Sequence, residues 1–302
     1  MNNERSTPAR DFEGYGAHPS HANWPNGARI AINLVMNYEE GSEPAIEHGE
    51  RHSETWFTES HGLNSGVIGR DLAAEGLFEY GSRVGFWRLM RIIQERDLPA
   101  TVYACALALE RNPAAAAAIR DSGFDVCSHG WRWVQHYLLS PEEERRHIRM
   151  AVESLTRTMG RAPEGWYWRY LPSVNTRHLL VEHGGFLYDS DYYGDELPFW
   201  TKVGDTPHLV IPYSLTTNDG QYASATGTSQ QWFEFVKDSF DTLYKEGATT
   251  PKMFIYASSG IRRGPPVSNG SWTMSRITRG VWFTRRIDIA RHWIKAHSYP
   301  GT

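Results

Sequence analysis

Two adjacent carboxylates, Glu39 and Glu40, follow the short apolar run "ARIAINLVMN" at residues 28–37. Turn-forming residues bound this run, which predicts a buried strand. Carboxylates at the end of such a strand could supply a general base and an orienting group, because partial burial and mutual repulsion raise the pKa of one of them. A solvated loop that carries two glutamates by chance would give the same pattern. The pair is therefore a candidate acid–base site.

A single histidine, His129, follows the strand predicted around Cys127 in "VCSHGWRW". One histidine at a strand end is more often a hydrogen-bonded structural residue than a metal ligand. Two chelating residues at close spacing would give a stronger metal signal. Four residues further on the chain has Trp133, whose indole does not bind a metal. On its own, His129 is a weak candidate.

Arg169 follows a third predicted strand, in "GWYWRYLPSVN", where a guanidinium could orient a carboxylate with two hydrogen bonds. A surface arginine in a proline-containing loop is the simpler interpretation. The segment "YDSDYYGDELPFW" holds Asp189, Asp191 and Asp195. One of these could pair with Arg169 while the others cap turns, and Asp191 is the candidate catalytic partner.

Flat aromatic side chains and short polar ones are the candidates for substrate contact at the same strand ends. In "TTNDGQY", the Asn-Asp-Gly sequence could equally form an ordinary turn. Aromatic residues also build ordinary cores. The candidate substrate-binding residues are Trp133, Trp166, Tyr167, Asn218 and Asp219.

Strand and helix patterns alternate along the chain with short connections. The clearest helix spans 140–160, with Ser140 at its N-cap, Pro141 in its first turn and Gly160 at its end. Such alternation predicts βα units around a parallel sheet, whose functional groups gather where strands end. No break in composition divides the chain. We therefore expect an irregular lead-in over residues 1–28 and a single catalytic domain over 29–297.

Composition excludes several classes of protein. The 302 residues carry a formal net charge of −4, so no basic field indicates nucleic acid as a partner. The polar N-terminus lacks the apolar core of a signal peptide, and no run reaches the roughly 18 apolar residues that span a membrane. Both cysteines lie in apolar surroundings, as buried thiols do. We expect a cytoplasmic protein with a small-molecule substrate.

Several colinear segments resemble the polysaccharide deacetylase superfamily, which has the NodB homology domain. The match is closer to its allantoinase-like branch, which includes cyclic imide hydrolases. The resemblance implies an α/β fold of the distorted (β/α) barrel, TIM-like type, hydrolysis of non-peptide C–N bonds, and a homo-oligomer. The segments that carry it are "HPSHANWPNGARIAINLVMNYEEG", "YGSRVGFWRLM", "VCSHGWRW", "GWYWRYLPSVNTR", "GGFLYDSDYYGDELPFW", "PHLVIPYSLTTND" and "VWFTRRIDIARHW".

By this resemblance, Glu39 and Glu40 match the paired-carboxylate first motif, which supplies a general base and then a metal ligand. His129 matches the first histidine of the His-x-x-x-His metal motif, and Trp133 replaces the second. The branch is thought to work without a metal, so we expect no cofactor. Glu39 or Glu40 would activate water and His129 would polarise the carbonyl or position that water. If the protein is metal-dependent, Glu40 and His129 would bind zinc or another divalent ion.

Residues 254–280 depart from the family pattern. The family's last motif ends in a histidine that serves as general acid, but this stretch contains no histidine and looks like a long loop. Codons that begin one base earlier can encode an amphipathic helix ending in two histidines, and a shifted codon at Ile255 can encode His. We hypothesise that the segment is translated out of frame. A diverged loop is the alternative, and resequencing codons 250–282 decides between them.

Three functions follow from these observations. The leading one is ring-opening hydrolysis of a cyclic amide, ureide or imide by carboxylate-activated water. The second is metal-dependent deacetylation of N-acetylated sugars. The third is a catalytically impaired homologue that lacks the final histidine.

Overall fold

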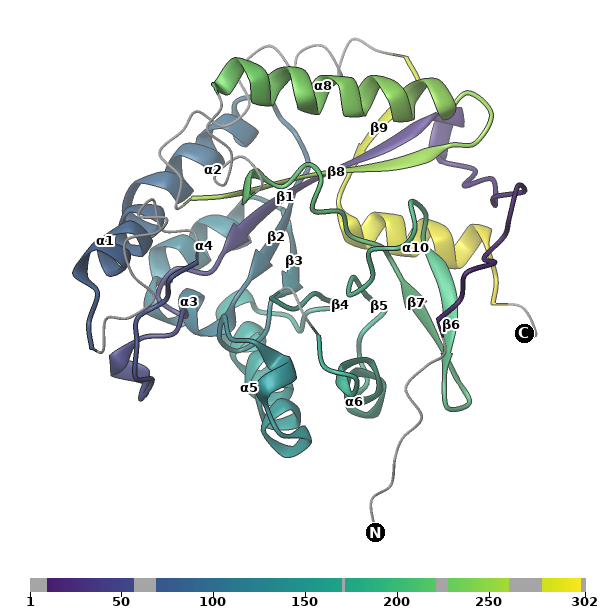
Figure 1. Cartoon of the computed structure of the whole chain (residues 1–302). Helices are drawn as coiled ribbons and strands as arrows, with labels where there is room; N and C mark the ends of the chain where they lie inside the picture. Colours follow the sequence, from purple (N-terminus) through teal and green to yellow (C-terminus); the bar gives the residue numbers. More distant parts are fainter. Residues whose placement is uncertain (1–9, 57–68, 170–171, 221–227, 261–278, 300–302) are drawn as a thin grey trace.

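A curled, mostly parallel sheet forms the centre of the computed structural model, which describes residues 10–56, 69–169, 172–220, 228–260 and 279–299 (Figure 1). Its strand order is β6-β7-β5-β4-β3-β2-β1-β8, and β9 pairs with the first half of β1. All neighbours are parallel except β6 and β7. The predicted α/β fold of the distorted barrel type is confirmed. The strands are β1 (Ile30–Tyr38), β2 (Thr101–Ala104), β3 (Asp125–Ser128), β4 (Gly165–Trp166), β5 (Tyr188–Asp189), β6 (Phe199–Val203), β7 (Thr206–Val210), β8 (Lys252–Ser259) and β9 (Val281–Thr284).

Helices follow most strands and cover the sheet. The predicted helix at 140–160 is α5, which has a full capping box between Ser140 and Glu143 and ends at Gly160 in the left-handed conformation. Between α1 and α2 the chain makes a π-helical turn, Gly81–Gly85. The helices are α1 (Leu72–Tyr80), α2 (Phe86–Gln94), α3 (Ala106–Arg111), α4 (Pro113–Asp121), α5 (Pro141–Met159), α6 (Thr176–His183), α8 (Ser229–Glu246) and α10 (Arg286–Ala296).

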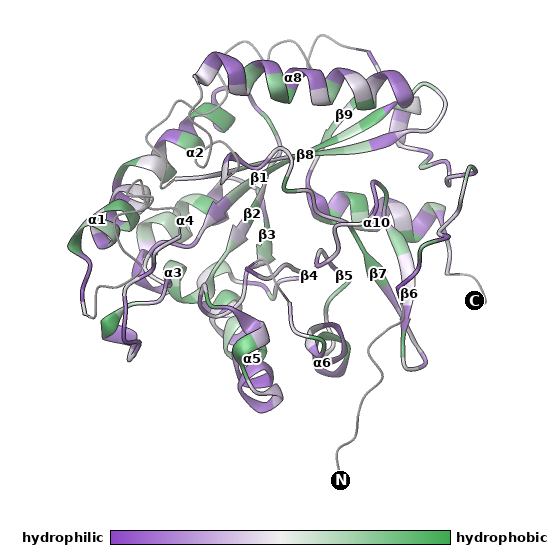
Figure 2. Cartoon of the chain, in the orientation of Figure 1, coloured by the Kyte–Doolittle hydropathy of each residue, from purple (hydrophilic) through white to green (hydrophobic). Residues whose placement is uncertain are grey.

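The two faces of the sheet bury two separate cores, because successive side chains of a strand point to opposite faces. On β1, Ile32, Leu34 and Met36 belong to an outer core packed against α2, α4, α5 and α8. Ala31 and Val35 belong to an inner core with α10. Figure 2 shows apolar colour along the central strands and mixed polar and apolar colour on the helices. We call these two sides the outer and inner faces.

Several local predictions from the sequence are wrong. The apolar run "PATVYACALAL" at residues 99–109 predicts one continuous strand, but β2 ends at Ala104 and α3 begins at Ala106. Helix α1 and strand β6 were not predicted. Strand β6 lies outside the βα repeat, because it pairs antiparallel with β7. The loop predicted from residue 254 is also wrong as far as Ser259, since β8 pairs with β1 from Lys252 to Ser259. Residues 261–278 lie outside the described residues, so the out-of-frame hypothesis stays a prediction.

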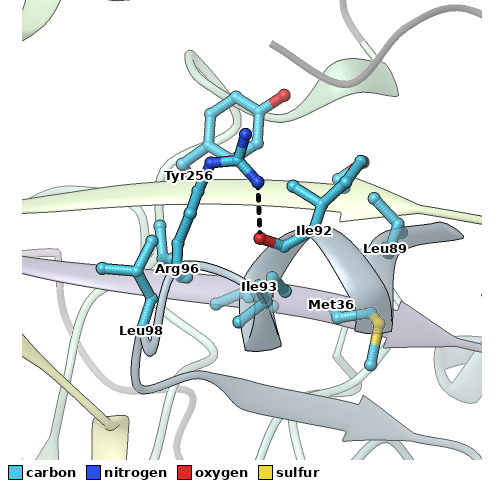
Figure 3. Close-up of a pocket in the computed structure, with 10 residues that line it drawn as sticks. Met36, Leu89, Ile92, Ile93, Arg96, Leu98 and Tyr256 are labelled. Atoms are coloured by element: carbon cyan, nitrogen blue, oxygen red, sulfur yellow. Dashed lines mark hydrogen bonds between the residues drawn. The ribbon is translucent and has the colours of Figure 1, made fainter. Parts of the chain in front are cut away.

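A small cavity of about 30 Å³ lies on the outer face between α2 and the β1–β8 pair (Figure 3). Leu34, Met36, Leu89 and Tyr256 contribute to its largely apolar wall, and Arg96 donates a hydrogen bond of 2.9 Å to the carbonyl of Ile92 at its edge. This volume admits water but no ring-sized molecule. The cavity is therefore a packing gap and not the substrate site.

Among the described helices, none combines the length and the apolar character that a transmembrane span requires.

Candidate active site

Glu39 lies at the end of β1 and its carboxylate faces the inner side of the sheet. Its Oε1 accepts a hydrogen bond from Asn37 Nδ2 at 3.0 Å and lies 3.1 Å from His129 Nε2. The side chain is 2% exposed. Its second oxygen, Oε2, is buried and has no hydrogen-bond partner within the described parts of the chain. A buried carboxylate oxygen without a partner is costly, so Oε2 is available to a water molecule or a substrate group.

His129 follows β3 and is fixed from two sides. Its Nδ1 lies 2.7 Å from the carbonyl oxygen of Tyr167, which can only accept a hydrogen bond. Its ring stacks on the Tyr167 ring, with centroids 5.2 Å apart and an interplanar angle of 2°. The Nε2 is thereby held toward Glu39. The structure thus brings together three residues singled out from the sequence: Glu39, His129 and Tyr167.

Glu40 points away from this group, toward the outer face. Its Oε2 accepts a hydrogen bond from the Glu39 backbone N–H at 2.9 Å. Its Oε1 is buried against Gly81 and Gly260, and any Cβ at Gly81 would overlap this carboxyl group. Burial raises the pKa of Glu40 to about 8, and the charge of Glu39 adds to the shift. The adjacent carboxylates therefore do not form one site.

Arg169 pairs with a carboxylate that the sequence did not single out. Its Nη1 donates to Glu54 Oε2 at 2.6 Å and to the Trp133 carbonyl at 2.9 Å. The guanidinium lies 3.8 Å from the centroid of the Trp133 ring. Both members of the ion pair are buried. The predicted pairing of Arg169 with an aspartate of the "DSD" segment is wrong, because Glu54 reaches the guanidinium from the loop after β1.

Asp191 lies on the outer face of the sheet and not beside Glu39, which is on the inner face. Its Oδ1 accepts from the Trp168 backbone N–H at 3.0 Å, and burial raises the pKa of Asp191 well above its ordinary value. Asp189 also faces this side, where it pairs with Arg177 and His208. The alternation of a strand explains the arrangement, since Tyr188 belongs to the inner core. The structure does not bring Asp191 to the Glu39–His129 group.

The predicted substrate-binding residues separate in the same way. Tyr167 and Asn218 lie on the inner side, and Asn218 Nδ2 donates to Tyr213 OH at 2.8 Å. Asp219 accepts hydrogen bonds from Ser258 Oγ at 2.7 Å and from Ser259 N at 3.1 Å, at the end of β8. Trp166 packs in the outer core against Phe186 and Trp168. The Trp133 ring is covered by the guanidinium of Arg169.

The residues suggested for a divalent metal do not fit one together. Glu40 binds the backbone with one oxygen and faces glycines with the other, His129 Nε2 faces Glu39, and Trp133 stacks on Arg169. Throughout the described residues, no three His, Cys, Asp or Glu side chains are grouped as metal ligands would be.

Several residues of the inner side were not predicted from the sequence. Asn37 and Asn33 precede Glu39 by two and six residues, both even numbers, so the alternation of β1 could have identified them as inward-facing polar groups. Tyr103 and Tyr213 form an aromatic floor with Tyr167, with ring centroids 4.6–5.8 Å apart. No local pattern indicated the two tyrosines, which come from β2 and from the segment after β7.

Arg286, at the start of α10, is fully buried. It donates hydrogen bonds to Ser190 Oγ at 2.8 Å, to Asn33 Oδ1 at 3.3 Å and to the carbonyl of Ile211 at 2.7 Å. These acceptors belong to β1 and to the segments after β5 and β7, so the arginine ties separate strands together at the start of α10.

Comparisons with known proteins agree with this architecture. The family model for polysaccharide deacetylase matches residues 75–184. A relative from Schizosaccharomyces pombe, named "Putative polysaccharide deacetylase", is 35% identical over 320 residues that cover 97% of this chain and 99% of the relative. The chain belongs to the polysaccharide deacetylase family.

Two solved structures resemble the whole fold. The crystal structure of the allantoinase Puue has a TM-score of 0.90 and 42% identity, and the match covers 96% of this chain and 98% of that one. A "probable Polysaccharide deacetylase" from Pseudomonas aeruginosa PAO1 has a TM-score of 0.90 and 43% identity, over 96% and 99% of the two chains. The chain is thus a family hydrolase of C–N bonds with an allantoinase among its structural neighbours.

Proposed function

We propose that this protein opens the ring of a cyclic amide, ureide or imide by hydrolysis, with Glu39 as general base. The observation that carries the proposal is the state of the Glu39 carboxylate. Asn37 and His129 fix its Oε1, and its buried Oε2 has no partner among the described residues. A carboxylate held in this way is oriented to take a proton from a water molecule.

The reaction follows from this geometry. Oε2 takes one proton of the water as the water oxygen bonds to the substrate carbonyl carbon, and the carbonyl π electrons move to its oxygen. When the tetrahedral intermediate collapses, the C–N bond breaks, its electron pair goes to the ring nitrogen, and the proton that Oε2 took from water passes to that nitrogen, which restores the carboxylate. Tyr167 stacks on His129 and packs against Tyr213, whose hydroxyl accepts a hydrogen bond from Asn218, and aromatic rings with polar neighbours suit a planar ring with alternating N–H and C=O groups.

A ring substrate is favoured over an N-acetylated sugar by two observations. The residues that would bind a metal point in different directions, as described above. The allantoinase that resembles this chain does so over almost its whole length. Membership of the family keeps sugar deacetylation as the second candidate function, with zinc or another divalent ion as cofactor.

A substrate panel tests the proposal. Allantoin, hydantoin, succinimide and chitooligosaccharides are incubated with the purified chain, with and without a chelator, and with the Glu39→Gln variant as control. We expect ring opening that survives the chelator and is lost in the variant. Release of acetate from the oligosaccharides, abolished by the chelator, would favour the sugar deacetylase instead. Absence of turnover on every compound would favour the impaired homologue, because residues 254–280 contain no histidine where the family resemblance expects one.

The small-molecule partner, a homo-oligomeric state and a cytoplasmic location complete the proposal. Size-exclusion chromatography with light scattering measures the oligomeric state, and a monomer at micromolar concentration would contradict that part.

A further inference from the structure

Two further polar atoms are unused at the ends of β1 and β8. Asn37 Oδ1 and Ser259 Oγ are buried, and neither has a hydrogen-bond partner within the described residues. The two strands are parallel neighbours (Figure 1), and their register pairs Asn37 directly with Ser259. Adjacent strands lie about 4.8 Å apart, so paired side chains on one face of the sheet are neighbours.

Both side chains lie on the inner face, as Glu39 does. Ala257 of β8 belongs to the inner core, and side chains alternate along a strand. Ser259 therefore faces inward and Ser258 faces outward. Asn37 faces inward because its Nδ2 donates a hydrogen bond to Glu39 Oε1 at 3.0 Å. The unused oxygens of Asn37 and Ser259 thus accompany the unused Oε2 of Glu39.

The amide of Asn37 is oriented by its contact with Glu39. A carboxylate oxygen accepts hydrogen bonds, so the amide nitrogen faces it and Oδ1 is left as an acceptor. Asn33, on the same face of β1, is bonded through both atoms of its amide. Its Nδ2 donates to the Thr284 carbonyl at 3.2 Å, and its Oδ1 accepts from Arg286 at 3.3 Å. Asn37 differs from Asn33 in this respect, and its Oδ1 is available to an N–H donor of a ligand.

The hydroxyl of Ser259 can donate a hydrogen bond, which Asn37 Oδ1 cannot. Asp219 holds the end of β8, because its Oδ2 accepts from the Ser259 backbone N–H at 3.1 Å and from Ser258 Oγ at 2.7 Å. These contacts use the backbone of Ser259 and leave its side chain unused. A buried hydroxyl without a partner is costly, and a substrate carbonyl would remove that cost.

We propose that Asn37 and Ser259 are specificity-determining residues that bind the imide edge of a ring substrate, that is, a ring N–H with a carbonyl on each side. Asn37 Oδ1 accepts a hydrogen bond from the ring N–H, and Ser259 Oγ donates one to a neighbouring carbonyl. The other carbonyl is the one attacked by the water that Glu39 activates. The inference rests on the proposed function and narrows its substrates from cyclic amides in general to rings that contain an imide group.

The pairing of these two groups favours an imide over other amides. An acceptor beside a donor complements the N–H and C=O groups of an imide, which occupy adjacent ring atoms. A lactam has the N–H, but its single carbonyl is the one attacked, so Ser259 would have no partner. An N-acetyl group lacks the second carbonyl in the same way. A site that hydrogen-bonds a substrate group discriminates against analogues without that group, so the pair predicts selection among rings.

Binding to a variant that cannot hydrolyse its ligand tests the inference. Calorimetric titration of the full-length Glu39→Gln protein gives the Kd of succinimide, N-methylsuccinimide and 2-pyrrolidone. N-methylsuccinimide lacks the N–H, and 2-pyrrolidone lacks the second carbonyl. We expect each change to raise Kd at least about tenfold, because each leaves a buried polar atom without its partner. Equal Kd values for the three compounds, or no measurable binding of succinimide, would overturn the inference.

Two substitutions, each added to Glu39→Gln, assign these effects to their residues. Asn37→Leu keeps the volume of the side chain but removes the acceptor, so N-methylation should no longer raise Kd. In Ser259→Ala, loss of the second carbonyl should no longer raise Kd. Such non-additivity identifies a direct contact. A methylation effect that persists in Asn37→Leu would overturn the role of Asn37, and a carbonyl effect that persists in Ser259→Ala would overturn that of Ser259.

Ser258→Ala is the matched control, because this serine faces outward. It should keep both the methylation effect and the carbonyl effect on Kd. If it removed either effect, the discrimination would depend on the shape of the end of β8 and not on the Ser259 hydroxyl, which would overturn the inference.

Unused oxygens can also bind a cation, and a second titration distinguishes this case. Zn²⁺ and Ca²⁺ are titrated into the wild-type protein, Asn37→Leu and Ser259→Ala. We expect the two substitutions to leave cation binding unchanged. A cation that binds the wild type and neither variant would show that the two oxygens are metal ligands, and would overturn the inference.

Hydrolysis separates this inference from the proposed function. If the wild type opens succinimide, N-methylsuccinimide and 2-pyrrolidone with similar kcat/KM, the proposed function stands and the inference fails. If it opens none of them while Glu39→Gln binds succinimide selectively, the proposed function fails and the two binding residues are still identified.

Discussion

Glu39 and Glu40 are neighbours in the chain, but their carboxyl groups serve opposite faces of the sheet. Glu39 meets Asn37 and His129 on the inner side. Glu40 is buried against Gly81, at the start of the π-helical turn on the outer side. The two acids thus differ in partners and in environment, and the differences predict distinct consequences of the same substitution.

Replacing each glutamate with glutamine should separate catalysis from structure. Glu39→Gln removes the proposed general base and should lower kcat about 100- to 10,000-fold on a substrate that the protein hydrolyses. Glu40→Gln is the matched control and should keep kcat within a few-fold, because its side chain does not reach the inner side. Steady-state kinetics measures both. Equal losses in the two variants would contradict separate roles.

The buried acid at Glu40 should make stability depend on pH. Its pKa is about 8 in the folded protein and 4.5 as the reference value, so the folded state holds a proton that the unfolded state loses. The free energy of unfolding should therefore be unaffected below pH 4.5. Between pH 4.5 and pH 8 the free energy of unfolding should fall by up to about 1.4 kcal/mol per pH unit. Above pH 8 it should fall no further.

Urea denaturation of the wild type and Glu40→Gln from pH 5 to pH 9 measures this contribution. The difference between the two proteins isolates Glu40 from other groups with raised pKa values, such as Glu43 at about 7. The stability of the variant relative to the wild type should increase up to pH 8. A difference that does not change with pH would show that Glu40 is not buried as a neutral acid.

Gly81→Ala should destabilise the protein even though Gly81 has helical dihedral angles of φ −53° and ψ −53°. Alanine in a helix ordinarily stabilises by up to about 1 kcal/mol relative to glycine. Here the new methyl group overlaps the Glu40 carboxyl group, and overpacking costs about 1–3 kcal/mol. In a Glu40→Ala background the same substitution should be neutral or stabilising. If Gly81→Ala still destabilised the protein in that background, the overlap with the Glu40 carboxyl group would not be the cause.

Breaking the Arg169–Glu54 pair should be far more harmful than breaking an exposed pair. Arg169→Met leaves the buried Glu54 carboxylate without its cation and should lower the free energy of unfolding by about 3–5 kcal/mol. Lys237→Met, which breaks the exposed pair with Asp241 on α8, should cost less than about 1 kcal/mol. Urea denaturation compares the two. Removing both partners of the buried pair should recover part of the loss, and equal costs for the two single variants would contradict the burial of Arg169.

The sequence alone determined the family, the fold class and the helices with strong local signals. Helix α5 is an example, because its cap residues and its apolar spacing act over a few neighbouring residues. Local patterns also marked the strand ends that carry Glu39 and His129. They failed for β6 and for the final residues of β8, whose strand character comes from pairing with β7 and β1.

Only the tertiary structure decided which of these residues meet. Side chains alternate along a strand, so consecutive residues face opposite sides of the sheet. Glu39 therefore contacts His129 while Glu40 lies against Gly81. In the same way, Tyr167 lies on the inner side and Trp166 in the outer core. Arg169 pairs with Glu54, which lies 115 positions away in the chain. No local sequence pattern connects these two residues. The sequence supplies the chemical groups at the strand ends, but sheet register and the packing of distant loops determine which of them face one another.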